Sequence, residues 1–278
     1  MELLSYYNKL ELQQKLSGWL IFGGYPEVIV ADSAQKKIAL LNELVNVHLL
    51  KDILTFDRVK NSKTLLNLLR LLAFQVGNEV SFAELAQQLG IDSKTVARYL
   101  DLFEKSFIIF NLGGFSRNLR KEITKKSKYY FYDNGILNAV IANFNEPPLR
   151  NDLGSLWENF ILIERFKKRA YQNIIANPYF WRTWDQKEID LIEEREGKLV
   201  GYEFKYGGKT PKAPKDWLNT YTDASYEIIN QNNYLDFITG ALLLSLIKFF
   251  LYHMRLLTII SCRLTIVTCI FIVISQPV

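Results

Sequence analysis

The chain has 278 residues, of which 49% are hydrophobic and 23% charged, and its formal net charge is +5. This balance is typical of a globular protein of about two domains and excludes a disordered chain. Two cysteines and 14 glycines exclude a disulfide-rich scaffold and a collagen-like chain.

Helices are predicted in the first 80 residues. Apolar residues recur at helical spacing from Ile38 to Phe56, and a second, leucine-rich helix is expected from about Thr64 to Val76. Upstream, Gly23-Gly24-Tyr25-Pro26 is expected to break the structure between two helical segments.

The next segment has the pattern of a helix-turn-helix. Ser81 and Glu84 form a capping box at the start of a helix that stops at Gly90, and Asp92 or Ser93 caps a second helix that runs to about Glu104. Two short helices joined at a glycine turn are typical of this motif. The apolar run 107–112 and the two glycines after it predict a strand and a turn, so the module is expected to be winged.

Basic residues near this module suggest contact with DNA, because clustered cations bind phosphate groups. The segment 117–128 carries six basic residues against Glu122, a local charge of +5. The alternatives are a solvated loop after the wing and a module that binds other proteins. The predicted DNA contacts are Lys94, Arg98, Arg117, Arg120, Lys121, Lys125 and Lys126.

The second half predicts a helix through Leu156 and Phe166 and then a β-hairpin, formed by runs at about 188–193 and 198–206. If Glu196-Gly197 form its tight turn, Asp190 falls opposite Glu203 with Cβ atoms about 5 Å apart. Side chains alternate along a strand, so Lys205 lies on the same face.

This grouping has a chemical use. Asp190 and Glu203 are predicted to bind Mg²⁺, since two facing carboxylates need a compensating cation. Lys205 beside them would orient or deprotonate the attacking water, and Glu158 on the preceding helix would add an outer ligand. An exposed strand face with an ordinary Glu/Lys alternation is the alternative.

The order Glu158, Asp190, Glu203-Phe204-Lys205 resembles the PD-(D/E)XK nuclease superfamily. Further motifs, in the order in which they occur, resemble a family of prokaryotic AAA-type ATPases with a nuclease-like C-terminal domain of unknown function (DUF4143-like). The resemblance covers roughly residues 1–239 and implies catalytic roles for Asp190, Glu203, Lys205 and Glu158. These further motifs are Gly23-Gly24-Tyr25-Pro26-Glu27, Tyr129–Gly135, Gly154–Phe160, Trp181-Arg182 and Glu188-Ile189-Asp190.

The ATPase core of that family is missing here. The one candidate phosphate loop, Gly208-Lys209-Thr210, has Glu203 where the pattern needs glycine and Pro211 where a helix should start. We therefore expect no ATP site in this chain and no ATP hydrolysis by it alone. A truncated protein with a separately encoded ATPase core as partner would explain the pattern.

The tail has a different composition. Residues 240–278 carry three basic residues, no acidic residue and both cysteines; without them the chain has 31 basic and 29 acidic residues, a net charge of +2. The tail is read as a transmembrane helix, a buried amphipathic pair or a non-native end. A cytoplasmic location is predicted, or a membrane-anchored one if the tail spans a bilayer.

The predicted fold is therefore α+β and multidomain. A helical segment like an ATPase lid (1–60) precedes a winged helix-turn-helix with the basic segment (61–128). An α/β PD-(D/E)XK nuclease-like domain (129–239) and the hydrophobic tail (240–278) complete the chain. The predicted function is DNA association with Mg²⁺-dependent phosphodiester hydrolysis, and the alternative is a non-catalytic module that binds DNA or protein.

Overall fold

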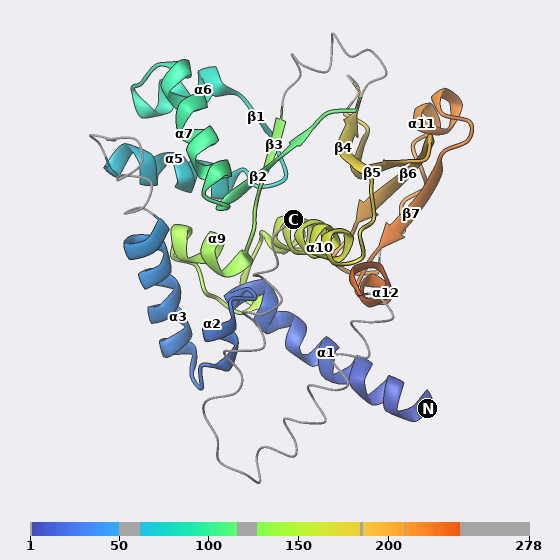
Figure 1. Cartoon of the computed structure of the whole chain (residues 1–278), viewed down its shortest axis with the longest axis horizontal. Coiled ribbons are helices and arrows are strands. Elements are labelled where there is room, and N and C mark those ends of the chain that lie inside the picture. Colours follow the sequence, from blue (N-terminus) through green and yellow to red (C-terminus); the bar gives the residue numbers. More distant parts are fainter. Residues whose placement is uncertain (1, 50–61, 116–126, 184–185, 209, 240–278) are drawn as a thin grey trace. The chain divides into compact units, whose positions relative to one another are not determined.

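The structure is a computed structural model that describes residues 2–49, 62–115, 127–183, 186–208 and 210–239 (Figure 1). The chain divides into two units after Ile238, close to the predicted change of composition, and the described residues up to Ile238 belong to the first unit. The predicted tail and the basic positions Arg117, Arg120, Lys121, Lys125 and Lys126 lie outside the described residues.

Helices make up the N-terminal part. Gly23 and Gly24 separate the first helix from the second, as predicted. The helical run expected from Ile38 is an α-helix to Glu43 and a π-helix beyond it, and residues 50–56 of that prediction are not described. The elements are α1 (Glu2–Phe22), α2 (Pro26–Val30), α3 (Ala34–Glu43), the π-helix Leu44–Leu49 and α5 (Ser62–Phe74).

Both predicted caps of the helix pair are present. The Ser81 hydroxyl accepts a hydrogen bond from the Glu84 amide, and Asp92, not Ser93, caps the second helix through the Thr95 amide. Gly90 ends the first helix in the left-handed region, where φ is 64°, which glycine adopts without strain. The two helices are α6 (Phe82–Leu89) and α7 (Ser93–Lys105).

A small sheet lies beside these helices (Figure 1). Its order is β1-β3-β2 and both pairings are antiparallel, so β3 is central. The predicted domain boundary at 128/129 falls inside β3. The strands are β1 (Glu79–Val80), β2 (Ile109–Gly113) and β3 (Ser127–Phe131).

The second sheet has the order β4-β5-β6-β7. The first three strands are antiparallel, and β7 runs parallel to β6 after a crossover through α11. Trp181 and Ile189 of this sheet share a buried hydrophobic cluster with Trp217 of α11. The elements are β4 (Asn177–Arg182), β5 (Glu188–Arg195), β6 (Lys198–Phe204), α11 (Lys215–Thr220), β7 (Ser225–Ile229) and α12 (Tyr234–Ile238).

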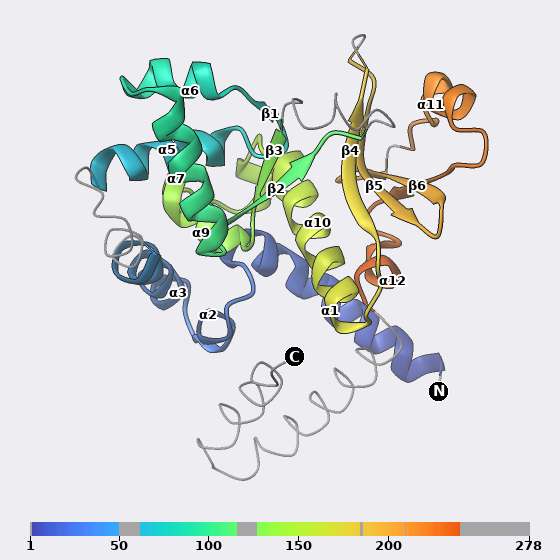
Figure 2. The same ribbon diagram turned by 45° about the horizontal axis from the view of Figure 1, so that its top comes forward.

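Helix α10 (Leu153–Tyr171) contacts both sheets, through β3 and through β6, and lies between them in two views (Figure 2). It comes after α9 (Asn134–Ile141) and a 3-10 turn at Pro147–Leu149. Its Trp157 is fully buried and packs against Tyr206 and Tyr234. Both sheets therefore share one helix, and its Glu158 lies next to that buried tryptophan.

Candidate active site

The β5–β6 hairpin has the predicted register. Both turn residues have positive φ, 49° at Glu196 and 75° at Gly197, as a two-residue hairpin turn requires. Paired residues run from Arg195 opposite Lys198 to Leu191 opposite Tyr202. Asp190, the next residue of β5, contacts β6 through its side chain: its Oδ2 accepts a hydrogen bond of 2.7 Å from the Phe204 amide. This bond fixes Asp190 beside the end of β6.

Four acidic side chains gather at this end of the hairpin: Glu158 of α10, Glu188 and Asp190 of β5, and Glu203 of β6. We call them the carboxylate cluster. Asp190 is 7% exposed. Burial raises the pKa of Asp190 well above its usual range, and the charges of Glu158 and Glu203 raise it further. The nearby cations therefore do not compensate the burial of the Asp190 carboxylate and its repulsion by Glu158 and Glu203.

Lys205 joins the cluster as predicted. Lys205 directly follows β6, and its Nζ lies 2.6 Å from Oε1 of Glu203, two residues earlier. Burial disfavours the charge of Lys205, but the bond to Glu203 and the nearby carboxylates outweigh burial and raise the pKa of Lys205. Lys205 is therefore an ammonium group held against a site carboxylate.

A second lysine was not predicted for this site. Lys128 of β3 is 1% exposed and forms an ion pair with Glu188, while its Nζ lies 3.7 Å from Glu158 Oε1. Burial opposes its charge, but Glu158, Glu188 and Asp190 together raise the pKa of Lys128. The sequence placed Lys128 at the end of a basic surface segment, whereas its side chain is a buried counter-ion of the carboxylate cluster.

Tyr130 occupies the same face of β3 as Lys128. Its hydroxyl donates a hydrogen bond of 2.6 Å to Glu158 Oε1. The sequence signal for both residues was their spacing: Lys128 and Tyr130 occupy alternate positions of a largely apolar strand, so they share one face. Glu158, predicted as the helix acid, is thus held from β3 by a lysine and a tyrosine.

The residues fit a divalent cation at Asp190 and Glu203. Oε2 of Glu203 is buried and accepts no hydrogen bond, and Asp190 is repelled by two neighbouring carboxylates. In the described ranges, no group of three or more His, Cys, Asp or Glu side chains is placed to hold one metal ion. Mg²⁺ commonly uses only one or two carboxylates and keeps several waters, so Asp190 and Glu203 are the residues that could hold it.

Several residues of the family-like motifs join elements of the fold and do not belong to the carboxylate cluster. The Asp133 carboxylate accepts hydrogen bonds from the amides of Gly24 (2.6 Å) and Ile136 (3.1 Å), so it joins the α1–α2 turn to the start of α9. Asn159 accepts a bond from the Phe131 amide at 2.7 Å and donates one to its carbonyl at 2.9 Å. These residues position α10 and β3, and through them Glu158 and Lys128.

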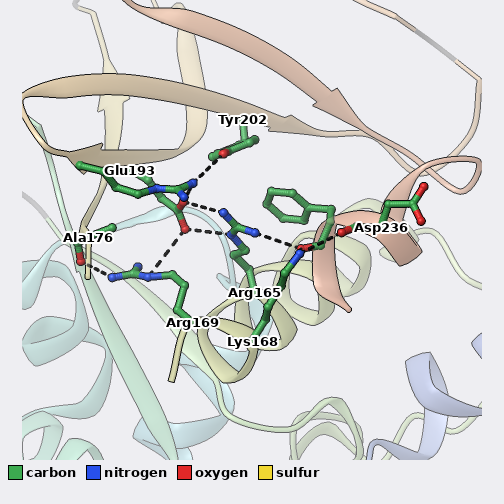
Figure 3. A network of polar contacts seen from close by, with 9 residues as sticks. Arg165, Lys168, Arg169, Ala176, Glu193, Tyr202 and Asp236 are labelled. Carbon is green, nitrogen blue, oxygen red and sulfur yellow. Dashed lines mark hydrogen bonds and ion pairs between the residues drawn. The ribbon is translucent and has the colours of Figure 1, made fainter. Parts of the chain in front are cut away.

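A second buried ionic cluster lies on β5 (Figure 3). Arg165 of α10 donates two hydrogen bonds to Glu193, at 3.0 and 2.8 Å, and Arg195 donates another. Burial would raise the pKa of Glu193, but these arginines and Arg169 hold it below its usual range. Arg165 and Lys168 also donate to the Phe237 carbonyl. The cluster ties α10 to β5 and α12 and is separate from Asp190.

The predicted DNA contacts that the structure describes are Lys94 and Arg98. Both are exposed on α7, one turn apart. Two of the acidic residues on this helix have local partners: Asp92 is the cap, and Asp101 pairs with Lys105 at 2.7 Å. Lys94 and Arg98 therefore lie on the exposed surface of the second helix, and Asp101 lies about one turn beyond Arg98.

No helix within the described ranges has the length and apolar character needed to cross a membrane.

Curated relatives from Mycobacterium bovis and Mycobacterium tuberculosis, both uncharacterized proteins, are each 28% identical to the chain over 186 residues, 66% of this chain and 41% of theirs. An uncharacterized protein of Methanocaldococcus jannaschii is 26% identical over 244 residues, 80% of this chain and 53% of its own length. The chain thus spans about half the length of these relatives or less.

No solved structure matches the chain significantly. Residues 13–147 match the model of a domain of unknown function, DUF8612. This match ends at Pro147, in the 3-10 turn before α10. Residues 153–241, which hold Glu158, Asp190, Glu203 and Lys205, match the family model of DUF4143, a second domain of unknown function.

Proposed function

We propose that this chain is the DNA-associated, nuclease-like part of an AAA-type ATPase-family protein, and that residues 153–239 hydrolyse DNA phosphodiesters with Mg²⁺. One observation carries the proposal: the β5–β6 register brings Asp190, Glu203 and Lys205 together beside Glu158. The DUF4143 match over these residues supports the resemblance on which the nuclease-like fold rests.

Each residue has a distinct part in this proposal. Mg²⁺, when bound, would supply a Lewis acid that polarises the phosphate and acidifies water. Asp190 and Glu203 would hold it, with Asp190 oriented by the Phe204 amide. Lys205 Nζ, held at Glu203 as an ammonium group, would orient the attacking water as a hydrogen-bond donor. Glu158 would act from α10 as an outer acid.

The helix pair supports DNA association. α6 and α7 meet at a glycine turn and are followed by β2 and β3, an order that agrees with a winged helix-turn-helix. Phe115 and Ser127, which lie on either side of the basic residues from Arg117 to Lys126, are both anchored near the carboxylate cluster. The Phe115 amide donates to the Phe180 carbonyl of β4, and Ser127 precedes Lys128.

Cleavage of a labelled DNA duplex and a single strand, with Mg²⁺, Mn²⁺ or EDTA, tests the catalytic proposal. We expect Asp190→Asn and Lys205→Met to reduce cleavage by about 100-fold or more, as the loss of a catalytic group commonly does. Glu194→Gln, which removes a carboxylate from β5 outside the cluster, should cleave normally. Wild-type protein that neither cleaves DNA nor binds either metal would contradict the proposal.

A non-catalytic module is the second candidate. It is favoured by Lys128 and Lys205, which already compensate Glu188, Glu158 and Glu203 without a metal. In that case the DNA or protein surface is the functional part, and Lys94→Gln with Arg98→Gln should weaken salt-sensitive DNA binding while Asp190→Asn leaves it unchanged.

A further inference from the structure

A cavity of about 350 Å³ borders the carboxylate cluster on the side of Glu188 and Glu203. Glu188 and Glu203 form part of its lining, and Tyr226 of β7 forms another part. The remaining walls come from Lys187 and from the segment that precedes α11. The lining residues of that segment are Pro211, Lys212, Pro214 and Lys215.

The three lysines around this cavity differ in their partners. Lys187 forms an ion pair of 2.5 Å with Asp216 in the first turn of α11. Lys212 and Lys215 are exposed, and within the ranges that the structure describes neither has an ion pair or a hydrogen bond from its side chain. The carboxylates on the cavity floor already have cations of their own, Lys128 for Glu188 and Lys205 for Glu203. Lys212 and Lys215 therefore remain available to an anion from solution.

The backbone that carries these lysines is restrained. Pro211 and Pro214 fix their own φ angles and limit the residues before them. Trp217, one turn further on, is fully buried and packs against Phe115 and Trp181. An anchored segment loses less conformational entropy when its side chains bind a ligand than a flexible one does.

We propose that Lys212 and Lys215 bind the phosphate groups of a nucleic-acid strand and place one phosphodiester over Glu203. This inference rests on the proposed function, because it names the substrate contacts of the same site. A phosphate chain suits the geometry, since two lysines three residues apart line one cavity of about 350 Å³ together with Glu203 and Tyr226. The lysines contact the strand and the carboxylates act on it, so binding does not require metal.

Fluorescence anisotropy of a labelled 20-nucleotide strand and of its duplex, in EDTA, tests binding without cleavage. We expect the double variant Lys212→Gln/Lys215→Gln to bind about tenfold more weakly near 0.1 M salt and to lower the slope of log K against log salt by roughly 1.4–1.8, the effect of two lost phosphate contacts. The matched control is Lys36→Gln/Lys198→Gln, which removes two exposed lysines outside the cavity. Circular dichroism establishes that both variants are folded.

Equal binding by the two double variants would overturn the inference, even if the wild type cleaves DNA. A selective loss in Lys212→Gln/Lys215→Gln upholds the inference even if no cleavage is found, in which case only the catalytic proposal fails. AMP serves as the probe for a free nucleotide. If AMP binds the wild type but not Lys212→Gln/Lys215→Gln, while neither oligonucleotide binds, the ligand is a mononucleotide and the inference of a strand is wrong.

Discussion

At the scale of single residues, Asp190 combines burial with two like charges. Its carboxylate is nearly inaccessible, lies near Glu158 and Glu203, and receives one hydrogen bond from the Phe204 amide. Groups that serve catalysis are often held in positions that destabilise the fold when their ligand is absent. The energetic cost of this position can be measured.

We expect Asp190→Asn to stabilise the metal-free protein at pH 7 by roughly 1–2 kcal/mol, the usual size of such gains. Asparagine keeps an oxygen that accepts the Phe204 hydrogen bond and removes the repulsion from Glu158 and Glu203. Urea unfolding in EDTA measures the change, and Asp223→Asn, an exposed aspartate, serves as the control. A less stable Asp190→Asn protein would show that Lys128 and Lys205 already neutralise Asp190.

The sequence predicted this residue's neighbours unevenly. The Glu196-Gly197 turn determines which residues face each other, so Glu203 and Lys205 could be placed next to Asp190 from local spacing. Lys128 could not be placed, because its contact with Glu188 spans 60 residues and depends on how β3 packs against β5. Its role is a property of tertiary packing, which no local pattern encodes.

At the scale of elements, the turn between α1 and α2 packs closely against the Asp133 carboxylate. Gly23 has a φ of 71°, and a Cβ at this position would overlap the carboxylate of Asp133 at the start of α9. Gly135 likewise lies against the Phe22 carbonyl. The break at Gly23-Gly24 was predictable from its composition, but the contact with a residue 109 positions away was not.

Gly23→Ala should therefore destabilise the protein by about 2–4 kcal/mol, since it combines backbone strain with loss of the Asp133 bonds. Gly18 provides a matched control on α1, because no atom lies within 4 Å of a Cβ added there. Gly18→Ala is expected to be neutral or to stabilise by about 0.5–1 kcal/mol through helix propensity. Thermal unfolding of both variants measures the difference in stability. Equal melting temperatures would exclude the proposed role of the Asp133 contact.

At the scale of the whole described unit, the candidate site lies where the two sheets meet. Lys128 and Tyr130 reach it from β3 of the first sheet, while Glu188 and Asp190 belong to β5 of the second. A backbone bridge between Gly114 and Phe180 joins the sheets nearby. Helices, caps and the hairpin can be derived from local sequence, whereas this junction arises from long-range packing. The site therefore depends on the two sheets folding together.

Lys128 gives the most direct test of that dependence. Lys128→Met should reduce the free energy of unfolding by about 3–5 kcal/mol, because it removes a fully buried ammonium group from the partly buried carboxylates of Glu158 and Glu188. The double variant Lys128→Met/Glu188→Gln should recover part of this loss. Lys105→Met breaks the exposed pair with Asp101, whose lysine and aspartate side chains are 70% and 56% exposed, and should cost less than about 1 kcal/mol. Urea unfolding followed by tryptophan fluorescence and by far-UV circular dichroism measures all three variants. If Lys128→Met is as stable as Lys105→Met, the buried lysine does not hold the sheets together.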